Sequence, residues 1–173
     1  MHSQVLGKLK EVYQQYPEHD LYLTGHSLGS AIAQLFAFEL AEYLHSESSP
    51  RNDELSHLRK GPLNIISFAA PQVGNEYFAK AFRIMEKKRW LRLVRFSNEG
   101  DLVPIVGAGW TRPTGVAVFL RASPTEPCQS SVAYETKSRN FLSQFGGHWN
   151  VVENHNMFAY MDRFLRPGNE ALR

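Results

Sequence analysis

Residues 21–31 read LYLTGHSLGSA and contain the pattern Gly-x-Ser-x-Gly at positions 25–29. The apolar, β-prone run before this pattern predicts a strand at 20–25, and the residues from Ile32 to His45 predict a helix after it. An ordinary strand–helix unit with a Gly-Ser turn has the same local pattern. We interpret the stretch instead as a nucleophile elbow, in which a serine lies on a sharp strand-to-helix turn with its hydroxyl exposed.

In such an elbow Ser27 adopts a strained backbone conformation, and the residues two before and two after it come close together. We expect Gly25 and Gly29 to avoid the collision that side chains would cause at these two positions. The N–H groups that open the following helix should then lie beside the serine.

The composition is that of an ordinary soluble globular domain. The chain has 173 residues, of which 43% are hydrophobic and 21% are charged, which suits one domain spanning 1–173. A formal net charge of +2 does not indicate a nucleic-acid-binding protein. Cys128 is the only cysteine, so no disulfide can form within the chain. No apolar run approaches the length of a membrane span.

The order of the remaining segments predicts a doubly wound, mostly parallel α/β sheet. The expected helices lie at 2–16, 32–45, 76–88 and 157–165, and the expected strands lie at 20–25, 63–70, 90–96 and 116–120. The helix after the elbow should bury one side, which consists of Ala31, Ile32, Leu35, Phe36, Leu40, Tyr43 and Leu44. We expect a polar surface loop at 46–61, and mostly loop around the strand at 116–120 within 105–138.

A serine nucleophile requires a base, and an acid that orients the base. Asp101 follows the strand at 90–96, at the end of the sheet where ligands and catalytic groups collect, and we favour it as the acid. Asp53 in the polar loop and Asp162 in a helix are the other candidates.

For the base, the chain order Ser, then Asp or Glu, then His leaves His148 and His155. We favour His155 because it lies at the start of the closing helix, but both remain open from the residues alone. We interpret His26, next to Ser27, as a structural hydrogen-bonding residue whose side chain points away from the nucleophile.

Four ordered motifs resemble the class 3 lipase family: GHSLG at 25–29, SFAAPQVGN at 67–75, NEGDLVP at 98–104, and His155 followed by Tyr160. The resemblance implies an α/β-hydrolase fold and hydrolysis of acylglycerol or phospholipid esters at a lipid interface. It implies Ser27, Asp101 and His155 as a catalytic triad, and thereby selects His155 over His148. It also implies the backbone N–H of Leu28 as one oxyanion-hole donor, and a reaction without a metal or an organic cofactor.

Two departures from the family accompany the resemblance. Ser30 stands where the family usually has a glycine, and a serine is a reasonable residue at the start of a helix. The family's first strands, its lid and a second oxyanion donor precede the elbow strand and have no counterpart here, so we expect the domain to be incomplete at its N-terminus. A non-catalytic domain that keeps the triad by descent and binds lipid or a protein is the competing hypothesis.

Overall fold

The computed structural model describes residues 2–47, 49, 53–106, 114–120, 130–133 and 151–165, so the predictions for Cys128 and His148 lie outside the described residues. Its helices, in chain order, are α1 (His2–Gln15), α2 (Leu28–His45), the 3₁₀ helix η1 (Ser56–Arg59), α3 (Glu76–Lys87), the 3₁₀ helix η2 (Val103–Ile105), α4 (Val151–His155) and α5 (Met157–Leu165). Its strands are β1 (Tyr22–His26), β2 (Leu63–Phe68), β3 (Leu91–Asn98), β4 (Val116–Leu120) and β5 (Ser130–Ala133).

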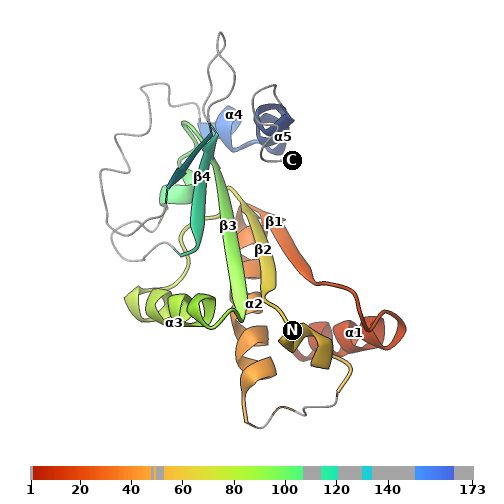
Figure 1. The fold of residues 1–173 in the computed structure, drawn as a ribbon. Helices are drawn as coiled ribbons and strands as arrows, with labels where there is room; N and C mark the ends of the chain where they lie inside the picture. The colour runs from red at the N-terminus through yellow and green to blue at the C-terminus, as the bar shows by residue number, and fades with distance from the viewer. Residues whose placement is uncertain are drawn as a thin grey trace.

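The described strands form one sheet in the order β1-β2-β3-β4-β5 (Figure 1). The first four strands run parallel, and β5 pairs with β4 in the antiparallel direction. Parallel neighbours need long crossovers, and α2 and α3 supply them between β1 and β2 and between β2 and β3. Because all four parallel strands point the same way, the residues that follow them meet at one end of the sheet.

One face of the sheet packs against α1, α2 and α3. Alternate residues of β2 and β3 point to this face and are buried there: Leu63, Ile65, Leu91 and Leu93. The helices contribute Tyr13, Leu40, Leu44, Phe82 and Met85 to the same cluster. Each large apolar side chain buried in this way contributes about 1.5–3 kcal/mol through the hydrophobic effect.

The opposite face packs against α5. Phe96, Val118 and Leu120 are buried with Tyr160 of α5, and Phe164 packs at the edge of the same cluster. Helices therefore cover both faces of a mostly parallel sheet, which confirms the predicted α/β architecture. This cluster also fixes α5 beside the carboxyl ends of β3 and β4.

The structure corrects the predicted buried side of α2. Ile32 is 47% exposed and Leu35 is 44% exposed, whereas Gln34 is buried. The buried side of α2 consists mainly of small or polar residues: Ser30, Ala31, Gln34, Ala37, Leu40, Ala41 and Leu44. Ala31, Leu40 and Leu44 are buried as predicted, whereas Ile32 and Leu35 are not, because small side chains let the helix lie close against the sheet at its start.

Four elements were not predicted, among them the 3₁₀ helix η2 that follows Asp101. The 3₁₀ helix η1 lies inside the expected polar loop, β5 lies inside the expected loop region, and α4 precedes the closing helix. His155 is therefore the last residue of a short helix rather than part of a loop leading into a long one.

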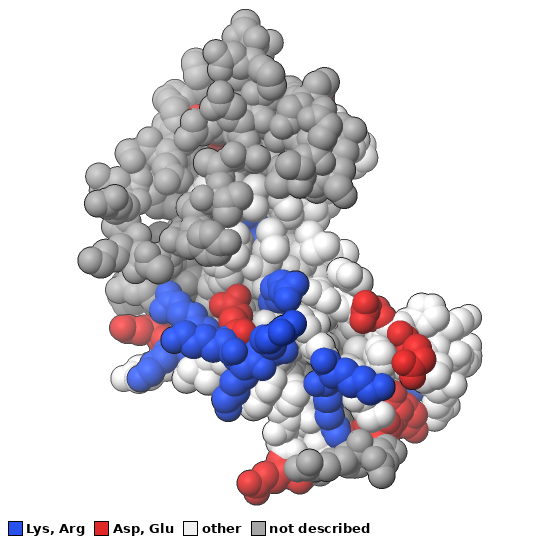
Figure 2. All heavy atoms as spheres, viewed as in Figure 1, with Lys and Arg blue, Asp and Glu red and all other residues white. Residues whose placement is uncertain are grey.

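Part of the described positive charge gathers on one face of the protein. Figure 2 shows Lys and Arg side chains gathered over α3 and the end of the sheet where the strands begin.

Candidate active site

Ser27 occupies the turn between β1 and α2 in a conformation that L-residues rarely adopt. Its backbone dihedrals are φ 56° and ψ −130°. A non-glycine residue in such a region costs on the order of 1–3 kcal/mol and persists only where its surroundings hold it. The Ser27 N–H donates to the carbonyl oxygen of Phe68 at 3.0 Å, and its carbonyl oxygen accepts the N–H of Ser30 at 3.0 Å. Neighbouring backbone on both sides thus holds the strained residue.

The predicted close approach of Gly25 and Gly29 is confirmed, but it requires a missing side chain at Gly25 only. A Cβ atom on Gly25 would lie 2.6 Å from the carbonyl carbon and 2.7 Å from the carbonyl oxygen of Gly29. A Cβ atom on Gly29 would meet no heavy atom of the described structure within 4 Å. The steric argument for Gly29 was therefore wrong, because the Cα–Cβ direction at this position points away from the strand.

Beneath the turn, a buried polar cluster joins α2 to β2. The Ser30 hydroxyl donates to Ser67 Oγ at 2.7 Å, and Gln34 Nε2 donates to the same oxygen at 3.1 Å. The serine that departs from the family pattern thus has a buried hydrogen-bond partner, and it ties the start of α2 to the end of β2.

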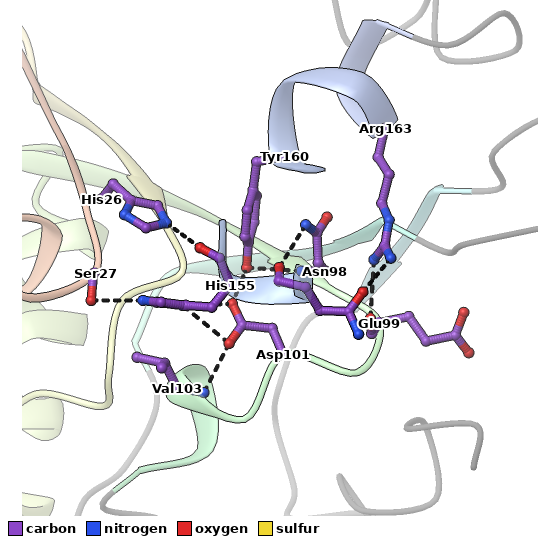
Figure 3. A network of polar contacts seen from close by, with 10 residues as sticks. His26, Ser27, Asn98, Glu99, Asp101, Val103, His155, Tyr160 and Arg163 are labelled. Atoms are coloured by element: carbon purple, nitrogen blue, oxygen red, sulfur yellow. Dashed lines mark hydrogen bonds and ion pairs between the residues drawn. The ribbon is translucent and has the colours of Figure 1, made fainter. Parts of the chain in front are cut away.

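The structure brings together Ser27, Asp101 and His155, which come from three separate parts of the chain (Figure 3). His155 Nε2 lies 2.9 Å from Ser27 Oγ. His155 Nδ1 lies 3.1 Å from Asp101 Oδ1 and 3.0 Å from Asp101 Oδ2. A carboxylate only accepts hydrogen bonds, so it selects the tautomer that is protonated at Nδ1 and leaves Nε2 free to accept the serine hydroxyl.

Asp101 is fully buried and receives hydrogen bonds from three directions. Besides His155, the Val103 N–H donates to Oδ1 at 2.9 Å and the Tyr160 hydroxyl donates to Oδ2 at 2.7 Å. These donors compensate for the water that burial removes from the carboxylate. They also fix the plane of the carboxylate against the imidazole of His155.

Tyr160 is itself held as a neutral donor. Burial raises the pKa of the Tyr160 hydroxyl well above its usual value, and the negative charge of Asp101 raises it further. The hydroxyl oxygen accepts the Asn98 N–H at 2.9 Å. Tyr160 entered the sequence analysis only through the family motif, and the structure places it in direct contact with the predicted acid.

A second set of polar contacts holds the loop after β3 against α4 and α5. Asn98 Nδ2 donates to the Asn154 carbonyl oxygen at 3.0 Å. Arg163 Nη2 donates to Asn154 Oδ1 at 2.5 Å, and Arg163 Nη1 donates to the Glu99 carbonyl oxygen at 3.0 Å. The sequence analysis missed these residues, although Asn98 and Asn154 lie within three residues of the predicted acid and base.

His26 makes the hydrogen bond predicted for it, but its partner is the main chain of His155. Its Nε2 lies 2.8 Å from the His155 carbonyl oxygen. The two imidazole rings also pack on each other, with centroids 4.7 Å apart and planes inclined by 37°. Leu28 follows Ser27 as the first residue of α2, where the opening N–H groups of a helix have no acceptor within the helix.

Of the alternative acids, Asp162 lies exposed on α5 and Asp53 lies away from Ser27. Asp53 forms ion pairs with Lys10 at 3.5 Å and with Arg59 at 3.7 Å.

Two cavities, of about 270 Å³ and 200 Å³, lie at the far end of the sheet, next to the C-terminal end of α2 and the start of β2. Among the described residues, no group of three or more His, Cys, Asp or Glu side chains is placed to hold a metal ion.

The parallel sheet, the helices on both faces and the serine between β1 and α2 define an α/β-hydrolase fold. The family description "Lipase (class 3)" matches residues 1–109, which is more than half of the chain. The chain belongs to the class 3 lipase family.

Similar proteins come from plants and fungi. Phospholipase A1-II 6 of Oryza sativa subsp. japonica is 34% identical over 135 residues, covering 72% of this chain and 32% of the relative. Phospholipase A1-II 1 of Oryza sativa subsp. indica is 34% identical over 104 residues, covering 58% of this chain and 22% of the relative. The Rhizomucor miehei lipase, in a propeptide complex, has a TM-score of 0.62 at 22% identity, over 88% of this chain and 44% of that chain.

The match covers a limited part of these proteins. The chain spans about a fifth to a third of the length of the two plant relatives and under half of the fungal structure. None of the helices in the described ranges combines the length and the apolar character that a bilayer span requires.

Proposed function

We propose that this protein hydrolyses carboxylic esters of lipids through an acyl-enzyme, with Ser27 as nucleophile, His155 as base and Asp101 as orienting acid. The observation that carries the proposal is the continuous hydrogen-bonded line from Ser27 Oγ through both ring nitrogens of His155 to the buried carboxylate of Asp101. The strained turn at Ser27 supports the same role, because such strain is concentrated at functional sites.

In the first half of the reaction, His155 Nε2 takes the proton of the Ser27 hydroxyl as Oγ attacks the ester carbonyl carbon. The negative charge that develops on the carbonyl oxygen is stabilised by the Leu28 N–H and by the positive end of α2. Asp101 accepts from Nδ1 and stabilises the imidazolium that forms. His155 then gives its proton to the leaving alcohol, and the acyl group remains on Ser27.

In the second half, a water molecule replaces the alcohol. His155 Nε2 takes a proton from this water as its oxygen attacks the acyl carbon, and the same proton returns to Ser27 Oγ when the fatty acid leaves. Every proton in this cycle passes through one imidazole nitrogen, so the position of His155 controls both halves of the reaction.

Two substrate classes follow from the family, acylglycerols and phospholipids. The relatives that are 34% identical carry the name phospholipase A1, whereas the fungal lipase is only 22% identical and supports the fold alone. We therefore place phospholipid esters first. An exposed apolar region around the site favours a lipid surface, since Leu28 is 67% exposed and Phe158, three residues after His155, is 77% exposed.

The test compares a short-chain diacyl phosphatidylcholine with a triacylglycerol of the same acyl length, each presented as mixed micelles. We expect fatty acid release from the phospholipid at the higher kcat/KM, and no release from either substrate by Ser27→Ala. Faster release from the triacylglycerol would reverse the order of substrates. A folded parent protein that releases no fatty acid from either would favour the non-catalytic, lipid- or protein-binding domain.

A further inference from the structure

We propose that His26 is a positioning residue that holds the base His155 at its working distance from Ser27. The proposal rests on the proposed function, since it assigns His26 a role in the reaction of that same site. The sequence predicted a structural hydrogen bond for His26 without naming its partner, and that partner lies 129 positions away in the chain, on the residue that contacts the serine.

The first observation is the hydrogen bond itself. His155 is the last residue of α4, a helix of five residues. The last carbonyl groups of a helix receive no hydrogen bond from within the helix, so they need a donor from elsewhere. His26 Nε2 lies 2.8 Å from this carbonyl oxygen. A carbonyl oxygen only accepts, so Nε2 of His26 carries the proton and donates it.

The second observation is that the same imidazole restrains the ring of His155. The two rings pack with centroids 4.7 Å apart, and the His26 ring also meets the Tyr160 ring edge-on at 5.8 Å. His26 therefore contacts the main chain and the side chain of the base together. One contact limits movement of the backbone of His155, and the other limits rotation of its ring.

The third observation is the place of His26 in the chain. It is the last residue of β1 and is covalently joined to Ser27. The hydrogen bond to His155 thus links the nucleophile's neighbour to the main chain of the base. Ser27 and His155 are therefore connected twice: directly, by the 2.9 Å contact between Oγ and Nε2, and indirectly, through His26.

The contacts of His26 help to explain how a helix of only five residues can hold His155 in a fixed position. A helix of this length has little stability of its own, and its position depends on tertiary contacts. Asn98 holds α4 through the Asn154 carbonyl, on the side of the acid. His26 holds it through the next carbonyl, on the side of the nucleophile.

Two substitutions test the hydrogen-bond donor of His26 and its aromatic ring separately. In His26→Gln the amide nitrogen reaches the place of Nε2 and still donates, whereas His26→Phe keeps an aromatic ring and loses the donor. Both are measured beside the parent for kcat and KM on the short-chain phospholipid, with thermal unfolding as the check of folding. We expect His26→Phe to lower kcat by about tenfold or more with little change in KM, because misplacement of a reacting group by about 1 Å costs up to about 10²-fold. His26→Gln should show a clearly smaller loss.

A second readout does not depend on turnover. The Nδ1–H of His155 donates to Asp101, so its proton is deshielded and should give a low-field resonance in NMR spectra, assigned by its absence in His155→Ala. The resonance should persist in His26→Gln and broaden or vanish in His26→Phe. If the parent shows no hydrolysis while the resonance still follows the donor at position 26, the proposed function fails and the positioning role stands.

Three results would overturn the inference. The first is a folded His26→Phe protein with the kcat of the parent. The second is an equal loss in His26→Gln and His26→Phe, which would assign the effect to something other than the donor. The third is a His155 resonance that is the same in all three proteins.

Discussion

The Tyr160 hydroxyl donates a 2.7 Å hydrogen bond to Asp101 Oδ2 and accepts the N–H of Asn98 at 2.9 Å. One side chain of α5 therefore joins the predicted acid to the end of β3. We expect Tyr160→Phe to lower the free energy of unfolding by about 1–3 kcal/mol, because it leaves the buried Asn98 N–H without its acceptor. It should also lower kcat, because the carboxylate of Asp101 loses one of its three donors. Tyr22→Phe, at a tyrosine that is 60% exposed, is the matched control for chemical denaturation and kinetics. Equal unfolding free energies for the two variants would contradict this account.

The same tyrosine predicts a loss of stability at alkaline pH. The folded state raises the pKa of Tyr160, so it binds the proton more tightly than the unfolded chain does. The stabilisation is fully present below the pKa of an unfolded tyrosine, about 10, and is lost as the pH rises above that value. The free energy of unfolding, measured from pH 8 upward, should therefore fall more steeply in the parent than in Tyr160→Phe. Parallel curves would show that ionisation of Tyr160 is not coupled to unfolding.

The two glycines around Ser27 should respond differently to a methyl group. Gly25→Ala places a Cβ atom 2.6 Å from backbone atoms of Gly29, so the turn must move or the strand must shift. We expect it to cost about 1–3 kcal/mol or more and to reduce activity sharply. Gly29→Ala places its methyl group in open space at the start of α2, where alanine favours the helix, and should be neutral or stabilising. Thermal unfolding and ester hydrolysis of the pair test this, and equal behaviour of the two variants would count against the close approach at Gly25.

The choice of base is tested by two alanine substitutions. His155→Ala removes the only ring placed on Ser27 Oγ among the described residues, and should lower kcat by about 10⁶-fold. His148→Ala, at the other histidine that the sequence left open, should keep a kcat close to that of the parent. A dead His148→Ala beside an active His155→Ala would reverse the assignment.

The sequence predicted most of the parallel sheet, because each strand is a short apolar run bounded by turn residues. The pattern Gly-x-Ser-x-Gly singled out Ser27, and position favoured Asp101, whereas the choice of His155 over His148 came from the resemblance to the class 3 lipase family. The sequence could not predict β5, which lies in a region interrupted by glycine and proline. It placed Ile32 and Leu35 on the wrong side of α2, because close packing on the sheet selected alanines and the hydrogen-bonded Gln34.

The hydrogen bonds that hold the candidate site in place could not be predicted from the sequence, for a different reason. The contacts of His26 with His155, of Asn98 with Asn154 and of Arg163 with Glu99 join residues between 56 and 129 positions apart. Nothing in the local sequence of these residues specifies their partners. Only the docking of α4 and α5 against the end of the sheet brings them together.

The most direct test of the central claim, that His155 and Asp101 activate Ser27, is covalent labelling with a fluorophosphonate followed by peptide mass spectrometry. Such a probe reacts rapidly only with an activated serine hydroxyl, and it reports activation without requiring turnover of a lipid. The account predicts one adduct, on Ser27, that is absent in Ser27→Ala and forms far more slowly in His155→Ala. A folded protein that remains unlabelled, or an adduct on a different serine that persists in Ser27→Ala, would contradict it.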